Sequence, residues 1–302
     1  MKRFLYILLS LSVLASWSGG AQAALEVLAC EPEWESLTRE IAGDRVRISS
    51  ATTAMQDPHH IEARPALVAR ARRAELLVCT GAELEVGWLP LLQRESGNTA
   101  IQAGQKGYFE AAQFARLIEK PAVLDRAMGD MHASGNPHLH LDPHNLLRIA
   151  DGLAKRLTEI DPAGAAIYEA RRADFAARMT AAIARWEKQA ASLKGVPVLV
   201  QHKSWSYLVE WLGLKVVADL EPKPGIEPSA AYLGQLLEKL KAQPAKMVLR
   251  TGYQSPKAAD WIAGQTGIRV AALPYTVGGS ERARDLFGLY DDILARLTEA
   301  AR

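Results

Sequence analysis

The chain has only one long apolar run, and it lies at the start. Lys2 and Arg3 precede the apolar stretch 4–15, and Ala21-Gln22-Ala23 has the small-x-small pattern of a cleavage site. Together these features are typical of a secretory signal peptide. No later run approaches the ~20 apolar residues that a membrane helix needs. We therefore expect residues 1–23 to be removed and a soluble protein starting at Ala24 to be exported to the periplasm. No cysteine follows the cleavage site immediately, so a lipid anchor there is not expected.

The chain also lacks an excess of charge. Residues 1–23 hold two basic and no acidic residues, which leaves 34 basic and 34 acidic residues in the remainder. A neutral balance offers no broad basic surface for a nucleic acid. Nucleic-acid binding is therefore not expected, and the remaining length suits two domains of ordinary size.

The common catalytic motifs are missing as well. The sequence contains no glycine-rich phosphate loop ending in Lys-Ser/Thr, no Gly-x-Ser-x-Gly elbow and no His-Glu-x-x-His pair. These absences argue against an ATPase, a serine hydrolase of the elbow type and a zinc protease of the paired-histidine type. No repeat of fixed short period is evident.

Cysteine is scarce, with only Cys30 and Cys79 in 302 residues. Each ends a short apolar segment that is predicted to be a strand. In an oxidising compartment the two thiols can pair, and they can do so only if the strands are neighbours. A disulfide is predicted, with two buried free thiols as the alternative.

Short β-rich runs alternate with amphipathic stretches along the chain. We expect helices at Pro65–Arg73 and Pro143–Leu157, each with proline at its first position. The expected strands are 25–30, Val46–Ala51, Leu76–Cys79, Val196–Val200, Lys215–Leu220, Lys246–Leu249 and Ile268–Leu273. This alternation predicts α/β layers with mainly parallel sheets.

One segment departs from that rhythm. Between Pro162 and Leu193 apolar residues recur at helical spacing, with no glycine after Gly164. The pattern predicts one helix of roughly 30 residues, ~45 Å long at 1.5 Å per residue. We expect it to join an N-terminal lobe, 24–161, to a C-terminal lobe, 195–302, as a rigid segment over 162–194. Two helices with a bend are the alternative.

Seven histidines gather in three separate segments. The first segment contains His59 and His60, the second contains four histidines between 132 and 144, and the third contains His202 after an apparent strand. Neutral imidazole is a preferred ligand of borderline-soft divalent metals. Three such segments predict one metal site assembled across the fold.

Four short motifs are informative because of the order in which they occur along the chain. They are Asp57-Pro58-His59, Asn136-Pro137-His138, Gln201-His202 and Glu227-Pro228-Ser229. Further matching stretches are Arg64-Pro65, Ala74-Glu75-Leu76, 80–85, Leu141-Asp142-Pro143, Tyr207-Leu208 and Gly213-Leu214. In this order they resemble the metal-binding solute-binding proteins of zinc and manganese ABC importers, over nearly the whole chain after the signal.

The resemblance implies a fold and a ligand set. It implies two α/β lobes bridged by one long rigid helix, with the metal in the cleft between them. It implies His59 and His138 as ligands from the first lobe and His202 from the second. Histidine at the third position is typical of zinc-binding relatives, whereas manganese-binding relatives place a carboxylate there. Three neutral imidazoles favour Zn²⁺ over Mn²⁺, with Cu²⁺ and Ni²⁺ as competitors.

The sequence departs from the family at two places. Many members carry an aspartate after the last strand, whereas this chain has Leu273-Pro274-Tyr275. Zinc-specific members often carry a long His- and acid-rich loop before the second ligand, whereas this chain has a short one. The fourth position therefore falls to water or His132. His140 and His60 are weaker candidates.

The resemblance implies an exported zinc-capturing protein that performs no catalysis. It would deliver Zn²⁺ to an ABC permease and its ATPase, as a monomer. One alternative is a zinc-dependent hydrolase with Glu62 or Glu83 as the base, since three histidines and an open position also describe catalytic zinc. A second alternative is an extracellular metallochaperone or adhesion module that uses the same site.

Overall fold

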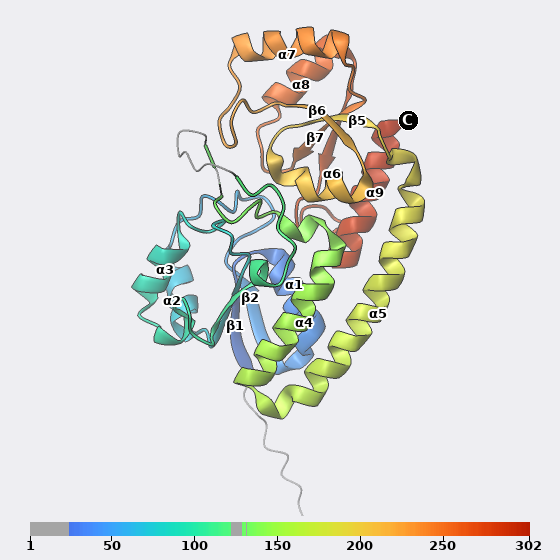
Figure 1. Ribbon diagram of the computed structural model, residues 1–302. Helices are drawn as coiled ribbons and strands as arrows, with labels where there is room; N and C mark the ends of the chain where they lie inside the picture. Colours follow the sequence, from blue (N-terminus) through green and yellow to red (C-terminus); the bar gives the residue numbers. More distant parts are fainter. Residues whose placement is uncertain (1–23, 122–128, 131) are drawn as a thin grey trace, which may run out of the picture.

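The structure, a computed structural model, describes residues 24–121, 129–130 and 132–302. The expected signal peptide, 1–23, lies outside these residues. The described chain forms two α/β lobes, one above the other in Figure 1, and each lobe contains a four-stranded sheet. Among the described residues, no helix is long and apolar enough to cross a membrane.

The first lobe is built on a sheet of order β2-β1-β3-β4, and all its strand pairs are parallel. Its strands are β1 (Leu25–Ala29), β2 (Val46–Ser50), β3 (Leu76–Cys79) and β4 (Tyr108–Glu110). Its helices are α1 (Pro32–Ala42), α2 (Pro65–Arg73), α3 (Leu89–Ser96) and α4 (Pro143–Ile160). The strand β4 was not predicted from the sequence, and α4 is one turn longer than expected.

The second lobe repeats this plan with the order β6-β5-β7-β8, again with parallel pairs throughout. Its strands are β5 (Pro197–Val200), β6 (Lys215–Asp219), β7 (Met247–Thr251) and β8 (Arg269–Leu273). Its helices are α6 (Ser206–Leu212), α7 (Ala230–Ala242), α8 (Lys257–Thr266) and α9 (Leu286–Ala301). The alternation of strand and helix therefore gives the parallel sheets that were predicted.

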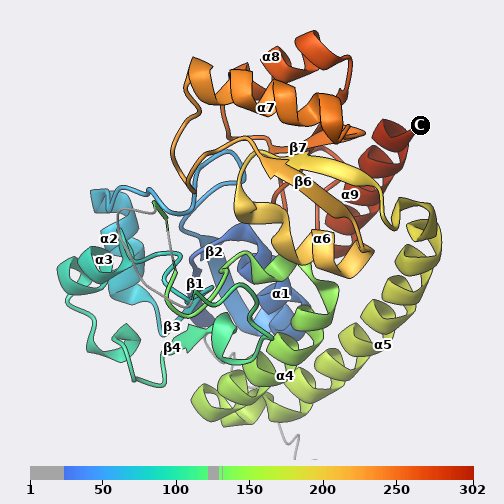
Figure 2. The same cartoon turned by 45° about the horizontal axis from the view of Figure 1, so that its top comes forward.

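One helix, α5 (Ala165–Gln189), runs along both lobes (Figures 1 and 2). It packs against α1 and α4 of the first lobe and against α9 of the second. It is a continuous α-helix of 25 residues, and short 3₁₀ turns at Pro162–Gly164 and Ala191–Leu193 flank it. The predicted long helix is confirmed, with its two ends wound more tightly than an α-helix.

A single apolar core extends behind the two sheets. It includes Val27 of β1, Trp186 of α5, Val200 of β5 and Tyr290 of α9, all buried. Smaller clusters lie on the outer face of each sheet. Because the core is continuous from one lobe to the other, the two sheets are held in a fixed relation on this side of the molecule.

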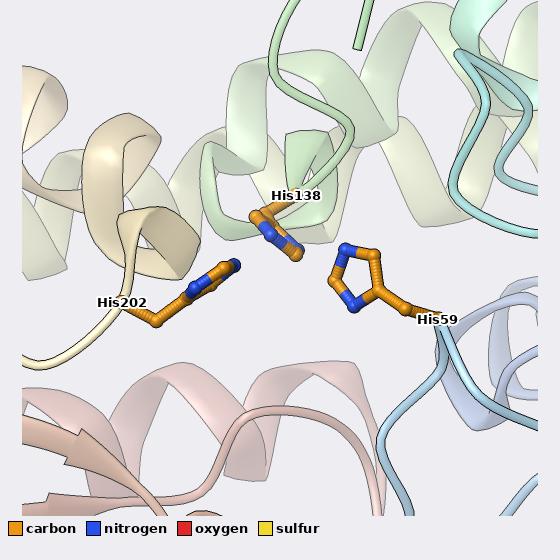
Figure 3. Close-up of side chains that lie close together, drawn as sticks. All are labelled: His59, His138 and His202. Atoms are coloured by element: carbon orange, nitrogen blue, oxygen red, sulfur yellow. The ribbon is translucent and has the colours of Figure 1, made fainter. Parts of the chain in front are cut away.

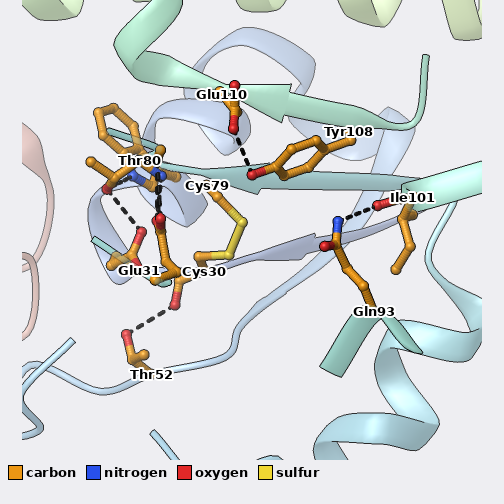
Figure 4. Close-up of a disulfide and its surroundings, with 12 residues drawn as sticks. Cys30, Glu31, Thr52, Cys79, Thr80, Gln93, Ile101, Tyr108 and Glu110 are labelled. Atoms are coloured by element: carbon orange, nitrogen blue, oxygen red, sulfur yellow. Dashed lines mark hydrogen bonds between the residues drawn. A yellow bond between two sulfur atoms is a disulfide. The ribbon is translucent and has the colours of Figure 1, made fainter. Parts of the chain in front are cut away.

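The two cysteines form a disulfide. Cys30 follows β1 and Cys79 ends β3, and these strands are neighbours in the first sheet, with the two Cα atoms 4.8 Å apart. Figure 4 shows the bond among buried polar side chains. The predicted pairing is confirmed, because adjacent parallel strands bring their carboxyl ends together.

Both sheets direct the carboxyl ends of their strands toward the junction of the lobes. The segment 51–64 follows β2, Gln201 and His202 follow β5, and Tyr275 follows β8. Ligand sites of parallel sheets form at this edge, since the loops that connect strand to helix converge there. The fold thus places three loops from distant parts of the sequence around one point.

Candidate metal centre

His59 lies in the loop after β2. Its backbone N–H and its Nδ1 both bond Asp57 Oδ1, at 3.0 and 2.7 Å. The Trp88 indole N–H donates to the Pro58 carbonyl at 2.8 Å, and this bond holds the loop in place. Because a carboxylate only accepts hydrogen bonds, Nδ1 carries the proton and Nε2 carries the free lone pair. That Nε2 is buried and has no hydrogen-bond partner among the described residues.

His138 precedes the 3₁₀ turn Leu139–Leu141. Its backbone N–H donates to Asn136 Oδ1 at 2.9 Å, and its Nδ1 lies 2.6 Å from the hydroxyl of Tyr275. Asn136 also donates through Nδ2 to the carbonyl of Lys203 at 2.9 Å, which connects this loop to the second lobe. The imidazole of His138 is almost completely buried.

His202 comes from the second lobe, directly after β5. Its Nδ1 bonds Glu221 Oε2 at 2.7 Å, and the same carboxylate oxygen accepts the Gly225 N–H at 2.7 Å. Glu221 follows β6, the neighbour of β5 in the sheet. The carboxylate again leaves Nε2 of the imidazole as the free nitrogen.

The three rings converge on one point (Figure 3). One ring nitrogen from each of His59, His138 and His202 lies within 4.8 Å of the other two. The carboxylates leave the Nε2 lone pairs of His59 and His202 free, and the Nδ1 of His138 is engaged by the hydroxyl of Tyr275. The structure therefore brings together the three histidines that the sequence singled out.

The surroundings of His138 favour its neutral form. Burial, followed by repulsion from His59 and His202, holds the pKa of His138 well below its usual range. Burial acts to raise the pKa of the Asp57 carboxyl, but the hydrogen bonds from His59 outweigh it, and the pKa of Asp57 is lowered. Neutral imidazole with an ionised carboxylate behind it is the state that binds a metal cation.

His132 lies directly beside the three rings. Its ring centroid is 5.4 Å from that of His59, and it lines the same cavity as His138 and His202. Burial, with repulsion from His59 and His202, lowers its pKa to about 4. Its ligand atoms fall outside the group of three. This position suits a residue that faces the ion across a water molecule.

The remaining histidines lie away from the centre. The Nε2 of His140 donates to the Tyr275 carbonyl at 2.9 Å, and its Nδ1 lies 3.1 Å from Glu33 Oε1, so it sits behind His138. His60 is exposed, and its ring centroid is 6.2 Å from that of His59. His144 stands in the first turn of α4, where the sequence placed it. Neither His60 nor His140 belongs to the group of three.

The sequence missed the partners that orient the rings. In the sequence, Asp57 and Tyr275 stand out only as parts of motifs, and no motif includes Glu221. A signal for Glu221 does exist: it follows a predicted strand, as His202 does, and the carboxyl ends of neighbouring parallel strands lie side by side. The order of strands in the sheet, which the sequence does not reveal, was needed to use that signal.

A second group of possible metal ligands, Cys30, Cys79 and Glu85, also lies within a small radius. The two sulfur atoms are bonded to each other, and Glu85 accepts hydrogen bonds from the N–H groups of Thr80 and Gly81. These side chains therefore serve the structure of the first lobe and leave the histidine cluster as the candidate centre.

Comparison with known proteins agrees with this geometry. Residues 27–300 match the family model described as "Zinc-uptake complex component A periplasmic". The "High-affinity zinc uptake system protein ZnuA" of Bacillus subtilis is 23% identical over 270 residues, which are 88% of this chain and 82% of that protein. A solved structure described as "Crystal structure of ZnuA" superposes with a TM-score of 0.75 at 26% identity, covering 92% of this chain and 98% of the other.

Relatives that carry a different metal in their names are also similar. The "Manganese ABC transporter substrate-binding lipoprotein scaA" of Streptococcus gordonii is 28% identical over 169 residues, which are 55% of this chain. This chain spans about half the length of that relative, 51%. The similarity thus covers relatives named for two metals, and the identity of the ion has to come from the site itself.

Proposed function

This chain belongs to the family of periplasmic A components of zinc-uptake complexes, and we propose that it captures Zn²⁺ between its lobes and delivers it to the permease of an ABC importer. The family is the substrate-binding part of such a transporter and acts with a permease and an ATPase. In this proposal residues 1–23 direct export to the periplasm. Residues 24–161 and 195–302 are the two lobes, and residues 162–194 connect them.

One observation carries the proposal. His59, His138 and His202 direct three ring nitrogens at one point, and each ring is held from behind by a different protein group. We propose these three nitrogens as the ligands of the transported ion. Three neutral imidazoles suit Zn²⁺ better than Mn²⁺, because manganese prefers oxygen ligands and lies lower in the stability order. Cu²⁺ and Ni²⁺ are the competitors that this donor set admits.

The fourth coordination position is proposed to hold water. Zinc favours four tetrahedral ligands, and an ion that must be released is better served by one exchangeable ligand. Among the described residues, no carboxylate belongs to the group formed by the three rings. The nearby carboxylates of Asp57 and Glu221 are bonded to Nδ1 atoms of the rings instead. His132 lines the cavity in which such a water would lie.

The cavity supports a transport role over hydrolysis. The space beside His132, His138 and His202 measures about 50 Å³, which suits an ion and a water molecule. The two glutamates considered as a catalytic base are engaged elsewhere. Glu62 pairs with Arg64 at the surface, and Glu83 accepts the Ala133 N–H at 2.6 Å.

Zinc titration of the metal-free protein against a chelator of known affinity tests the proposal. Replacement of His59, His138 or His202 by alanine is expected to weaken binding more than hundredfold, about 2.8 kcal/mol. His144→Ala is the matched control, because Asp142 holds His144 as Asp57 holds His59, but at the surface. With water in the fourth position, His132→Ala should change affinity less than threefold. Equal losses at His144 and the other three would contradict the ligand assignment.

A further inference from the structure

Tyr275 is a buried tyrosine in the loop after β8, and its hydroxyl reaches across to the other lobe. The side chain is 2% exposed and is surrounded by the rings of His138, His140 and Tyr253, with centroid distances of 5.6, 4.9 and 5.6 Å. Its hydroxyl oxygen lies 2.6 Å from Nδ1 of His138. Tyr275 of the second lobe therefore bonds the imidazole of His138, which belongs to the first lobe.

The backbone of Tyr275 is fixed by the first lobe in turn. His140 Nε2 donates to the Tyr275 carbonyl at 2.9 Å. The next residue, Thr276, donates through its hydroxyl to Glu33 Oε2 of α1 at 2.5 Å. His140, Glu33 and Thr276 are all buried, so these bonds form a polar contact between the lobes directly behind the metal centre. The hydroxyl of Tyr275 thus has little freedom to move relative to His138.

The three groups behind the rings differ in charge. Asp57 and Glu221 are carboxylates, which together balance one divalent cation. The third ring, that of His138, has the hydroxyl of Tyr275 behind it in place of a carboxylate. A neutral hydroxyl oxygen can accept the Nδ1 proton of His138 without adding a third negative charge beside the site. The hydrogen bond thereby leaves Nε2 of His138 as the nitrogen available to the ion.

We propose that Tyr275 is a positioning residue that orients His138 for the metal from the opposite lobe. This inference rests on the proposed function, because it assigns a role to Tyr275 only if His138 is a ligand. It implies that metal affinity depends on the contact between the lobes: a relative displacement that separates the hydroxyl from Nδ1 frees the ring of His138 and weakens the site. No group of the first lobe bonds that nitrogen among the described contacts.

The variant Tyr275→Phe removes the hydroxyl and keeps the ring. Tyr168→Phe is the matched control, since Tyr168 is equally buried and its hydroxyl bonds Asp161 at 2.5 Å, far from the cluster. Orienting partners of metal ligands contribute tenfold to hundredfold in affinity. We expect a zinc dissociation constant raised by that factor in Tyr275→Phe and changed less than twofold in Tyr168→Phe. The visible spectrum of the Co²⁺-loaded protein should shift only in Tyr275→Phe, because only there does a ligand ring reorient.

The outcomes separate this inference from the proposed function. A wild-type protein that does not bind zinc overturns the proposed function. A wild type that binds zinc, with Tyr275→Phe showing the same affinity and the same Co²⁺ spectrum, overturns the role of Tyr275 alone. If Tyr275→Phe does not fold, nitrogen NMR of the zinc-loaded wild type decides. We expect His138 to bind through Nε2 with a slowly exchanging Nδ1 proton, and binding through Nδ1 would overturn the inference.

Discussion

At the residue scale, the centre depends on how each ring is held as much as on which rings are present. Asp57 and Glu221 each accept the Nδ1 proton of a ligand candidate, and Tyr275 bonds the third. Such partners fix the orientation of a ring and raise the basicity of its free nitrogen. Substitution of a residue that bonds a ligand ring should therefore change the affinity of the protein for the ion.

Glu221 offers a clear test of that dependence. Glu221→Gln keeps a hydrogen-bond acceptor but removes the charge, so we expect zinc affinity to fall about tenfold, or ~1.4 kcal/mol. Glu221→Ala should cost more, because Nδ1 of His202 then loses its partner. Glu227→Gln, an exposed site nearby, is the control for the loss of one negative charge. Zinc competition titration measures all three, and equal affinity of Glu221→Ala and wild type would refute the orienting role.

A pair of buried carboxyl groups near the disulfide makes a prediction about pH. Burial raises the pKa of Glu85 to about 7, and burial with repulsion by Glu85 raises that of Glu31 well above its usual value. The folded state therefore holds protons that the unfolded state has already lost above about pH 4.5. Its stability falls as the pH rises through the raised pKa of Glu85.

The metal-free protein and its Glu85→Gln variant should show this difference in urea unfolding. Between pH 5 and pH 7.5 the wild type is expected to lose roughly 1–3 kcal/mol relative to Glu85→Gln, whose amide does not titrate. The comparison cancels the titration of the groups that do not interact with Glu85, so the difference reports Glu85 together with its neighbour Glu31. Parallel stability profiles for the two proteins would show that Glu85 does not carry a raised pKa.

Two histidines show which features of the site the sequence can predict and which it cannot. Asp57-Pro58-His59 and Asp142-Pro143-His144 have the same local geometry, in which one aspartate oxygen bonds both the backbone N–H and Nδ1 of the histidine. Of these two histidines, only His59 belongs to the group of three with His138 and His202. The motif alone predicts a held imidazole. Its place between the lobes decides whether a metal can reach it, and family resemblance supplied that information before the structure did.

At the scale of the elements, the strands and the long helix followed directly from the pattern. All seven predicted strands agree with the structure to within one or two residues, because buried parallel strands appear as continuous apolar runs. The short strand β4 (Tyr108–Glu110) was not predicted, because three residues are too few to show a periodic pattern. The order of the strands in each sheet could not be predicted from the sequence. Without that order, Glu221 could not be identified as the partner of His202.

The disulfide joins β1 to β3 across 49 residues of chain. Chain-entropy reasoning gives a loop of this length about 4 kcal/mol of stabilisation through the unfolded state. Reduction of the metal-free wild type should lower its free energy of unfolding by up to this amount, measured in urea with and without a thiol reductant. The double variant Cys30→Ala/Cys79→Ala is the control and should not respond to reductant. An unchanged midpoint for the reduced wild type would show that the bond adds nothing to stability.

At the scale of the whole molecule, the site needs both lobes at once. His59 and His138 belong to the first lobe and His202 to the second, whereas the continuous core and α5 hold the two sheets together behind them. An ion between the lobes therefore adds bonds that the unfolded chain lacks. Binding only to the native state stabilises by RT ln(1 + [L]/Kd), which is about 4 kcal/mol at a thousandfold excess over Kd.

Thermal unfolding should accordingly depend on zinc. The midpoint of the metal-free wild type is expected to rise when Zn²⁺ is added and to return when a chelator removes it. His202→Ala, which withdraws the ligand of the second lobe, should lose most of the rise, and His144→Ala should retain it. A wild-type midpoint that does not respond to zinc would be incompatible with a site formed between the lobes.

The central claim is that one ion is held by three imidazole nitrogens drawn from both lobes. X-ray absorption spectroscopy of the zinc-loaded protein in solution tests it most directly, because imidazole rings give a characteristic scattering pattern beyond the first bonded atom. The expected result is three imidazole ligands and one further nitrogen or oxygen ligand at about 2.0–2.1 Å from zinc. A sulfur neighbour near ~2.3 Å, or fewer than two imidazoles, would contradict the assignment of His59, His138 and His202.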